Sequence, residues 1–311
     1  MKLHFIISII IAIGLFSCES LINDIPPSKL PKAESKLVVH AFISPQAENI
    51  NVTVSESEPL FGTSPGPNGI LPDALVKISN GLKEVVIPYD KSGNIYSIEA
   101  AHFPIIPSKT YYLTVSRGNK KVTAECAVPE KSVTIKSFTL DTIDLKDPAS
   151  DQTKFATLKM NWQDIAGEAN FYRVHASMML EYGVPVKDGS NEGKETMVTS
   201  GFNFQWDESS GRGELQTDNA LDGLMFSSPL GKVNLVTVMG VDKFSLNNPK
   251  IKSLTMEVFN TDINYYKYHR DMDLRGNADN PFAEPSMIHS NIVGGLGCFG
   301  AYNVGRRVEL Y

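Results

Sequence analysis

The feature that most constrains the fold of this 311-residue chain is a series of short alternating segments separated by turn residues. Apolar and polar side chains alternate over residues 50–55 and 74–78, and strand-forming residues fill 37–43, 111–115 and 122–126. Such segments recur roughly every ten to fifteen residues, with Asn80-Gly81 and Gly118-Asn119 as turn signals. This spacing predicts a small antiparallel β-sandwich.

Pro129 marks a predicted domain boundary. We therefore expect an N-terminal Ig-like β-sandwich over 36–128 and a C-terminal β-rich domain over 129–311. The strand that ends at Trp162, the polar turn after it and the strand 171–176 are typical of fibronectin-like sandwiches. One helix is expected near 262–275, because Thr261 or Asp262 can cap it and Gly276 can end it. The predicted fold class is mainly β: two β-sandwich (Ig/fibronectin-like) modules with one short C-terminal helix.

The N-terminal residues predict export. An apolar run from Phe5 to Phe16 is too short for a bilayer span of about 20 residues. The sequence Leu15-Phe16-Ser17-Cys18 resembles a lipoprotein cleavage box. We expect a signal peptide over 1–17, lipidation of Cys18 and an extended tether over 18–35. An ordinary cleaved signal with an incidental cysteine remains the alternative.

Charge and cysteine content narrow the function classes. The formal net charge is −6, with no lysine and arginine stripe, which argues against a nucleic-acid partner. After Cys18 the chain holds two further cysteines, Cys126 and Cys298. They either pair in a disulfide or remain as two buried free thiols, and two cysteines are a poor disulfide framework, which favours the thiols.

No catalytic or cofactor motif passes a physical test. Gly295 to Gly300 fits the dinucleotide-binding fingerprint, but a strand follows where a helix is needed. The glycines therefore predict a bulge or a close backbone approach. The histidines lack metal-ligand spacing, and His269 with its charged neighbours predicts a solvated helix face. We expect no metal, no cofactor and no enzyme, and a hydrolase with paired carboxylates is the least favoured alternative.

Aromatic residues give the best lead to a contact surface. Phe202, Phe204 and Trp206 alternate within the polar region 183–213. Aromatic side chains bury a large area at low conformational cost, so these three are candidates for ligand or partner contact. The alternative is a hairpin strand whose aromatic side chains pack inward.

The C-terminal third carries a specific resemblance. The segments 280–285, 290–292 and 294–302 resemble the ending of a Bacteroidota lipoprotein family, catalogued as domain of unknown function 4249. The similarity extends to 37–39, 72–78, 93–96 and 265–266, and so covers nearly the whole chain after Cys18. The resemblance implies an outer-membrane lipoprotein encoded beside a TonB-dependent receptor, in a family without established catalytic residues.

The expected function follows from the anchor and the resemblance together. We expect a lipid-anchored lipoprotein of the cell outer membrane that acts as an accessory or ligand-binding partner of a TonB-dependent outer-membrane transporter in nutrient uptake. Whether it faces the periplasm or the cell surface stays open. A surface adhesion or matrix module is the alternative function.

Overall fold

The computed structural model describes residues 35–57, 69–146, 152–185, 194–210, 213–239, 242–276 and 287–311. Cys18, the signal peptide 1–17 and nearly all of the tether 18–35 lie outside these residues, so the predictions made for them stay predictions. Residues 36–56 and 70–311 form one compact unit. Within the described residues, no helix is long and apolar enough to cross a membrane.

Among the described residues before 129 there are eight strands, and each segment predicted to be a strand is one of them. They are β1 (Leu37–Ile43), β2 (Asn49–Glu56), β3 (Leu75–Ser79), β4 (Glu84–Ile87), β5 (Tyr89–Asp90), β6 (Ile95–Glu99), β7 (Thr110–Arg117) and β8 (Lys120–Ala127), with the short 3₁₀ helix η2 (Ala100–His102) before β7.

The remaining elements include longer strands and the helix. They are β9 (Ile135–Lys146), β10 (Gln152–Gln163), β11 (Phe171–Pro185), β12 (Glu195–Asn203), β13 (Gln205–Asp207), η3 (Glu208–Ser210), β14 (Leu215–Thr217), β15 (Met225–Ser227), β16 (Leu230–Met239), β17 (Asp242–Ser245), β18 (Asn247–Thr261), α2 (Ile263–Gly276) and β19 (Leu296–Leu310).

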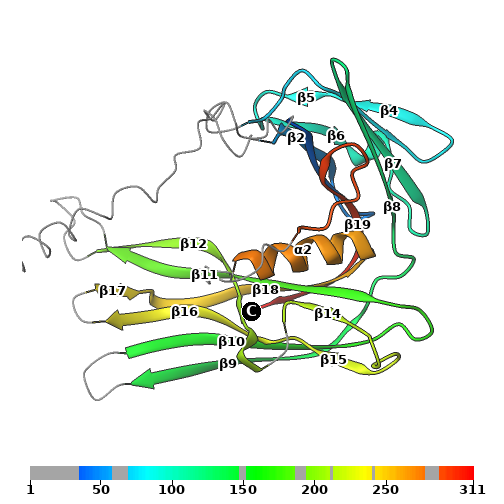
Figure 1. The fold of residues 1–311 in the computed structure, drawn as a ribbon. Coiled ribbons are helices and arrows are strands. Elements are labelled where there is room, and N and C mark those ends of the chain that lie inside the picture. The colour runs from blue at the N-terminus through cyan, green and yellow to red at the C-terminus, as the bar shows by residue number, and fades with distance from the viewer. Residues whose placement is uncertain are drawn as a thin grey trace, which may run out of the picture. The chain divides into compact units, whose positions relative to one another are not determined.

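These strands form three sheets (Figure 1). The largest has the order β12-β11-β18-β19-β1-β2-β6-β5, with β14 added beside β11. A second sheet has the order β13-β16-β10-β15, with β17 beside β16 and β9 beside β10, and a third has the order β4-β3-β7-β8. The prediction of a mainly β fold with two sandwich modules and one helix is confirmed.

Two apolar cores define the two sandwiches. The first sandwich packs β3, β4, β7 and β8 against the β1, β2 and β6 part of the large sheet, around residues such as Val39, Ile78 and Tyr111. The second sandwich packs β10, β15 and β16 against β11 and β18, around Trp162 and Tyr172. In β1 every second side chain points into the core, as alternation requires.

The last strand belongs to both sandwiches. Residues 296–301 of β19 pair in parallel with β1, and residues 302–310 pair antiparallel with β18. Phe299 and Ala301 are accordingly part of the first core. The first core draws on residues 37–128 and 292–301, and the second core on residues 133–258. The domain boundary at Pro129 stays a prediction.

The glycines of the fingerprint-like segment allow the backbone contacts that β19 makes. Gly297 has φ +105°, and a Cβ atom there would lie 2.1 Å from the carbonyl oxygen of Val39 in β1. Because this oxygen is part of the backbone, no side-chain rotation relieves the overlap. The predicted close backbone approach is confirmed.

Helix α2 begins and ends where the sequence predicts. The Asp262 Oδ1 atom accepts the backbone N–H of Tyr265 at 2.8 Å, which is an N-cap hydrogen bond, and the helix ends at Gly276. The helix contacts β19 and β11 (Figure 1). His269 does not face solvent as predicted, because its ring packs 4.9 Å from Phe42 and 4.2 Å from Tyr265. The prediction failed because it extended the charged, exposed character of the neighbouring Arg270 to the environment of His269 as well.

Candidate functional site

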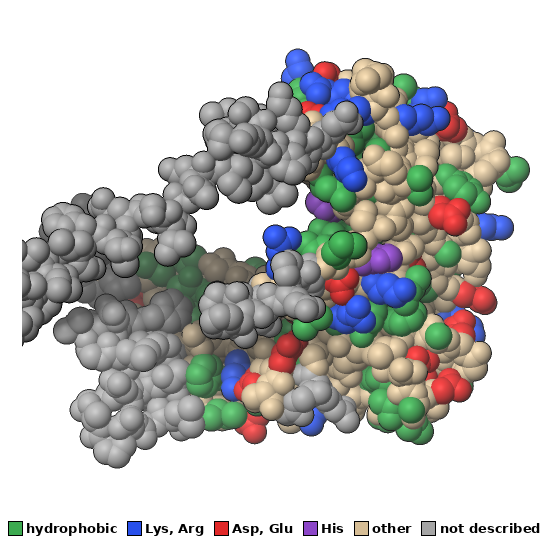
Figure 2. Space-filling view, in the orientation of Figure 1, with side chains coloured by type: hydrophobic (Ala, Val, Ile, Leu, Met, Phe, Trp, Pro, Cys, Tyr) green, Lys and Arg blue, Asp and Glu red, His purple; other side chains and the backbone are tan. Residues whose placement is uncertain are grey.

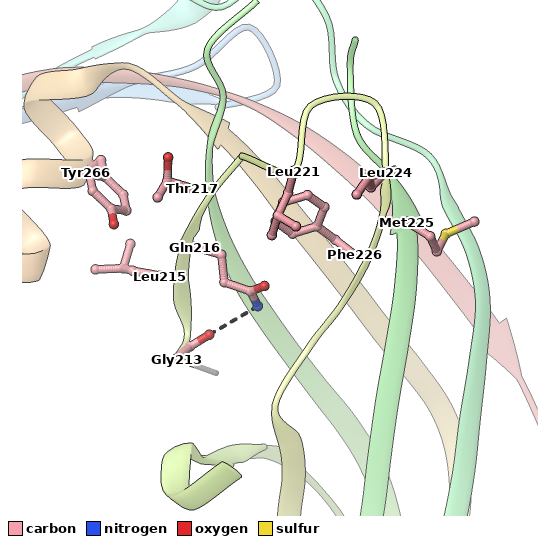
Figure 3. Close-up of a pocket in the computed structure, with 9 residues that line it drawn as sticks. All are labelled: Gly213, Leu215, Gln216, Thr217, Leu221, Leu224, Met225, Phe226 and Tyr266. Carbon is pink, nitrogen blue, oxygen red and sulfur yellow. Dashed lines mark hydrogen bonds between the residues drawn. The ribbon is translucent and has the colours of Figure 1, made fainter. Parts of the chain in front are cut away.

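A cavity of about 480 Å³ lies between the β14–β15 segment and helix α2 (Figure 3). Its volume is within the range of about 300–1,000 Å³ that small-molecule sites occupy. Apolar side chains dominate the walls, with one amide and two hydroxyls: Gly213, Leu215, Gln216, Thr217, Leu221, Leu224, Met225, Phe226 and Tyr266. We call it the loop pocket.

The loop pocket exists because two short strands join opposite sheets of the second sandwich. Strand β14 pairs with the start of β11, whereas β15 pairs with the end of β10. The connecting turn is tight, with positive φ at Ala220 (63°) and Gly223 (69°). Gln216 supports it, since its Nε2 atom donates to the carbonyl oxygens of Gly213 and Ser227, both at 3.2 Å.

The apolar base of the loop pocket is rigid. The ring of Phe226 packs against Trp162 at 5.6 Å and against Tyr172 at 5.5 Å between centroids. Trp162 is fully buried, and Tyr172 donates its hydroxyl to Asp164 Oδ1 at 2.6 Å. Burial and this hydrogen bond raise the pKa of Tyr172, so the phenol keeps the proton that it donates.

A half-buried cation joins the pocket segment to helix α2. Arg173 of β11 donates Nε to Glu214 Oε1 at 2.5 Å and Nη1 to the Tyr265 hydroxyl at 3.1 Å. Charge-assisted bonds of this kind hold planar groups in a fixed orientation. The same Nη1 atom lies 3.2 Å from His269 Nδ1. Burial, then the charges of Arg173 and His40, lower the pKa of His269 to about 4.

The chemistry of the loop pocket is that of binding. Among the described side chains that line it, only Tyr266 is titratable, and none is a nucleophile beside a base. A ligand there would be held by apolar contact with Leu221, Leu224 and Phe226 and oriented by Gln216 or Thr217. The prediction that the chain is not an enzyme stays a prediction.

A second, more polar hollow of about 470 Å³ lies on the large sheet. Its floor includes Phe259 and Tyr302, whose rings stack at 4.9 Å, and Glu257. Glu257 accepts Arg306 Nη2 at 2.6 Å and lies 3.0 Å from His175 Nδ1. Hydrogen bonds from His175 and Arg306 hold the pKa of Glu257 below its ordinary value despite burial. On the face shown in Figure 2, acidic and basic side chains are interspersed and form no single stripe.

The three aromatic residues predicted to contact a ligand or partner differ in exposure. Phe204 is only 4% exposed and belongs to the second core, so for this residue the inward-packing alternative holds. Phe202 and Trp206 are half-buried, Phe202 beside Tyr182 and Trp206 over Gly231. Contact through Phe202 and Trp206 stays a prediction, and neither lines the loop pocket.

Of the two alternatives for the cysteines, a disulfide or two free thiols, the structure shows free thiols. Cys126 and Cys298 are both buried and unpaired with each other. Burial raises the pKa of each thiol, with a further contribution from Asp262, so both are poor nucleophiles.

Sequence reasoning missed several residues that organise the loop pocket. Asp164 and Asp218 carried no recognisable signal, because each stands in a polar turn. Arg173 carried none, because it is one polar position in a strand of alternating residues. The only sequence feature that pointed to this region is a pair of acidic residues at the two ends of one tight turn, Asp218 and Asp222.

Comparison with protein families matches residues 24–307 to one family, described as Domain of unknown function (DUF4249). The match covers almost all of the chain, including both sandwiches and the helix. No curated protein matches the chain in a sequence comparison.

Proposed function

The chain belongs to the DUF4249 family, and on that premise we propose that it is a lipid-anchored outer-membrane lipoprotein that serves a TonB-dependent transporter as a ligand-binding accessory. The anchor is the thioether-linked lipid of Cys18, and residues 18–35 act as the tether. The folded unit supplies the binding surfaces.

The observation that carries this proposal is the Leu15-Phe16-Ser17-Cys18 box behind an apolar run. Each buried methylene of a lipid contributes about 0.8 kcal/mol, so two or three acyl chains anchor a protein almost permanently. A permanently anchored β protein stays next to the membrane barrels of the same bilayer. The resemblance described above supplies the kind of barrel, a TonB-dependent receptor.

The loop pocket supports a binding role over a catalytic one. Its walls combine leucine and phenylalanine side chains with one amide and two hydroxyl groups, the usual composition of a small-molecule site. An accessory protein with such a pocket would hold a ligand close to the mouth of the barrel.

The anchor is tested by labelling cells with a radioactive or clickable fatty acid. The full chain incorporates the label, whereas the Cys18→Ala variant does not. Cys126→Ala is the matched control, because Cys126 is a buried free thiol of the same chain and its loss leaves the label in place. An unmodified Cys18 thiol in the purified protein, detected by mass spectrometry, would refute the anchor.

The partner is tested by affinity purification from solubilised outer membrane with a tag after Tyr311, which is 59% exposed. The proposal expects an untagged TonB-dependent receptor, identified by mass spectrometry, in stoichiometric yield with the full chain and in reduced yield with Cys18→Ala. Clean isolation of a lipidated chain without any receptor refutes the partner and favours the adhesion alternative.

A further inference from the structure

Three aspartates from two loops converge at one end of the second sandwich. Asp164 follows β10, and Asp218 and Asp222 lie in the turn between β14 and β15. One carboxylate oxygen from each lies within 4.8 Å of those of the other two. Asp164 and Asp218 are buried, whereas Asp222 is exposed.

The surrounding backbone holds two of these carboxylates in place. Asp164 Oδ2 accepts the backbone N–H of Gly223 at 2.6 Å, and Asp222 Oδ1 accepts the backbone N–H of Gly167 at 2.7 Å. Each bond runs from one loop to the other. A Cβ atom on Gly223 would lie 3.2 Å from that of Ala166, so the loops are in close contact. These hydrogen bonds and contacts therefore hold the carboxylates of Asp164 and Asp222 in defined positions.

Asp218 is different, because nothing in the described part of the chain satisfies its carboxylate. The residue is 7% exposed, and its hydrogen bonds to described residues involve only its backbone: its N–H donates to the Asn170 carbonyl and its carbonyl accepts the N–H of Leu221. None of the ion pairs between described residues includes any of the three aspartates. Three carboxylates this close together repel one another, and no hydrogen-bond donor or cation among the described residues offsets the charge of Asp218.

We propose that Asp164, Asp218 and Asp222 bind a Ca²⁺ ion that links the two loops. The ligand atoms are all hard oxygens, which Ca²⁺ prefers and which Zn²⁺ sites usually supplement with nitrogen or sulfur. Two oxygens on opposite sides of one ion lie about 5 Å apart for Ca²⁺ and about 4 Å for Mg²⁺. The three ligand oxygens lie within 4.8 Å of one another, close enough to share one Ca²⁺ ion, and the ion is assigned by the titration described below.

The exposed third ligand makes the site accessible. Asp222 lies at the surface, so an ion enters from solvent and keeps water in its remaining coordination positions. Because Asp164 Oδ1 and Oδ2 each already accept a hydrogen bond, the ion takes a second lone pair of one oxygen. The sequence alone does not indicate this site, because the spacing of the three aspartates does not follow the continuous calcium-loop pattern.

The ion has a structural consequence for the loop pocket. Leu221 and Leu224 line that pocket and lie within or next to the turn that Asp218 and Asp222 bracket. Bound Ca²⁺ fixes this turn against the 164–170 loop and so fixes one wall of the pocket. The inference concerns the cation alone and holds whether or not the proposed transporter partner exists.

The test uses the full chain, purified in detergent, stripped with EGTA and titrated with CaCl₂ in a calorimeter. The proposal expects one equivalent of Ca²⁺ to bind and saturating Ca²⁺ to raise the melting temperature by about 5 °C or more. No heat of binding and identical melting in Ca²⁺ and EGTA would overturn it. Equal affinity for Mg²⁺ would overturn the assignment to calcium.

Two variants locate the ion. Asp218→Asn preserves the shape but removes the unpaired charge, so it lowers Ca²⁺ affinity at least tenfold while the EGTA-treated protein melts at or above the wild-type temperature. A purely structural aspartate would instead lower that temperature. Glu130→Gln, an exposed change far along the chain, keeps wild-type affinity. Wild-type affinity in Asp218→Asn would refute the site.

Discussion

The first sandwich buries almost only apolar side chains, whereas the second also encloses carboxylates, amides and hydroxyls. Among the described residues, one buried polar residue, Ser44, precedes Pro129, and the others follow it: Thr157, Asp164, Asn170, Asp218, Ser228, Glu257, Asn260, Thr261 and Asn303. Burying such groups costs free energy unless each finds a partner. The polar half must therefore be held together by specific contacts, while the apolar half needs only dense packing.

Several candidate sites lie in the half of the molecule that buries most of the polar side chains. The loop pocket, the Arg173 cluster and the three aspartates all lie in the second sandwich or on helix α2. The first sandwich contributes Phe42 and His40 to the packing of that helix. The polar hollow on the large sheet is an exception, because Ser44 and Asn49 of the first half line it together with Glu257.

The largest predicted effect tests whether the two halves are separable at all. Gly297→Ala places a Cβ atom against the Val39 carbonyl at a positive φ, so it lowers the free energy of unfolding by about 4 kcal/mol. Both tryptophans, Trp162 and Trp206, lie in the second sandwich. Because β19 contributes to both cores, we expect the urea midpoint measured by tryptophan fluorescence to fall as much as the midpoint measured by circular dichroism.

The matched control for this change is Gly118→Ala. Gly118 also has a positive φ, +59°, but no atom lies within 4 Å of its added Cβ. Only the backbone cost of about 1 kcal/mol is expected there. A fluorescence midpoint that Gly297→Ala leaves unchanged would show that the sandwiches unfold independently.

The next effect separates packing from contact within the aromatic triplet. Phe204→Ala removes a core side chain and lowers the free energy of unfolding by about 3 kcal/mol. Phe202→Ala, at a half-buried position of β12, costs about 1 kcal/mol. Thermal melting of both variants measures the difference. Equal losses would mean that Phe202 is as much a core residue as Phe204, which would weaken its role as a contact residue.

Local patterns predicted much of this fold, since alternation and capping act over a few residues. The strands before Pro129 and the Asp262 cap follow from neighbouring side chains alone. The parallel pairing of β1 with β19 does not, because it joins residues such as Val39 and Gly297 that no local pattern connects. The glycines showed that a close approach was needed without showing to which strand.

The candidate sites were less predictable than the fold. Asp164 and Asp218 stand in polar turns whose composition is the same whether their side chains are buried or solvated. Their burial results from two loops meeting across the sandwich, which is a tertiary event. For Phe204 the period of two correctly placed it opposite its neighbours, but the period could not say which face was the core.

The third prediction concerns acid sensitivity beneath helix α2. The folded-state pKa of His269 is about 4, below its ordinary value of 6.5, so the unfolded chain binds the proton first as the pH falls. The stability that neutral His269 contributes is complete above pH 6.5 and is lost as the pH falls toward 4. His269→Gln therefore reduces the loss of unfolding free energy between pH 7 and pH 4.5 by about 2 kcal/mol.

The control for the histidine is His102→Gln in the first sandwich. The His102 side chain is 67% exposed, so its replacement leaves the acid-induced loss at the wild-type level. Urea titrations at the two pH values provide the measurement. If both variants resist acid equally, the contrast between a solvated histidine and a packed one does not hold.

The fourth prediction has the smallest expected effect and concerns a buried carboxylate. Burial of Asp262 makes the protein lose stability as the pH rises, whereas burial of His269 makes it lose stability as the pH falls. Burial raises the pKa of Asp262 to about 7 although it caps α2, and its Oδ2 atom has no hydrogen-bond partner among the described residues. A folded-state pKa above the ordinary 3.8 means that stability is complete below pH 3.8 and is lost as the pH rises through about 7. Asp262→Asn keeps the cap but cannot titrate, so the loss of unfolding free energy from pH 5 to pH 6 shrinks by about 1 kcal/mol. In the first sandwich the exposed Asp90 has a lowered pKa, through hydrogen bonds from Ser92, so Asp90→Asn removes stability at pH 8 instead. Urea titrations that give both asparagine variants the same sign at pH 8 would contradict the distinction between buried and solvated carboxylates.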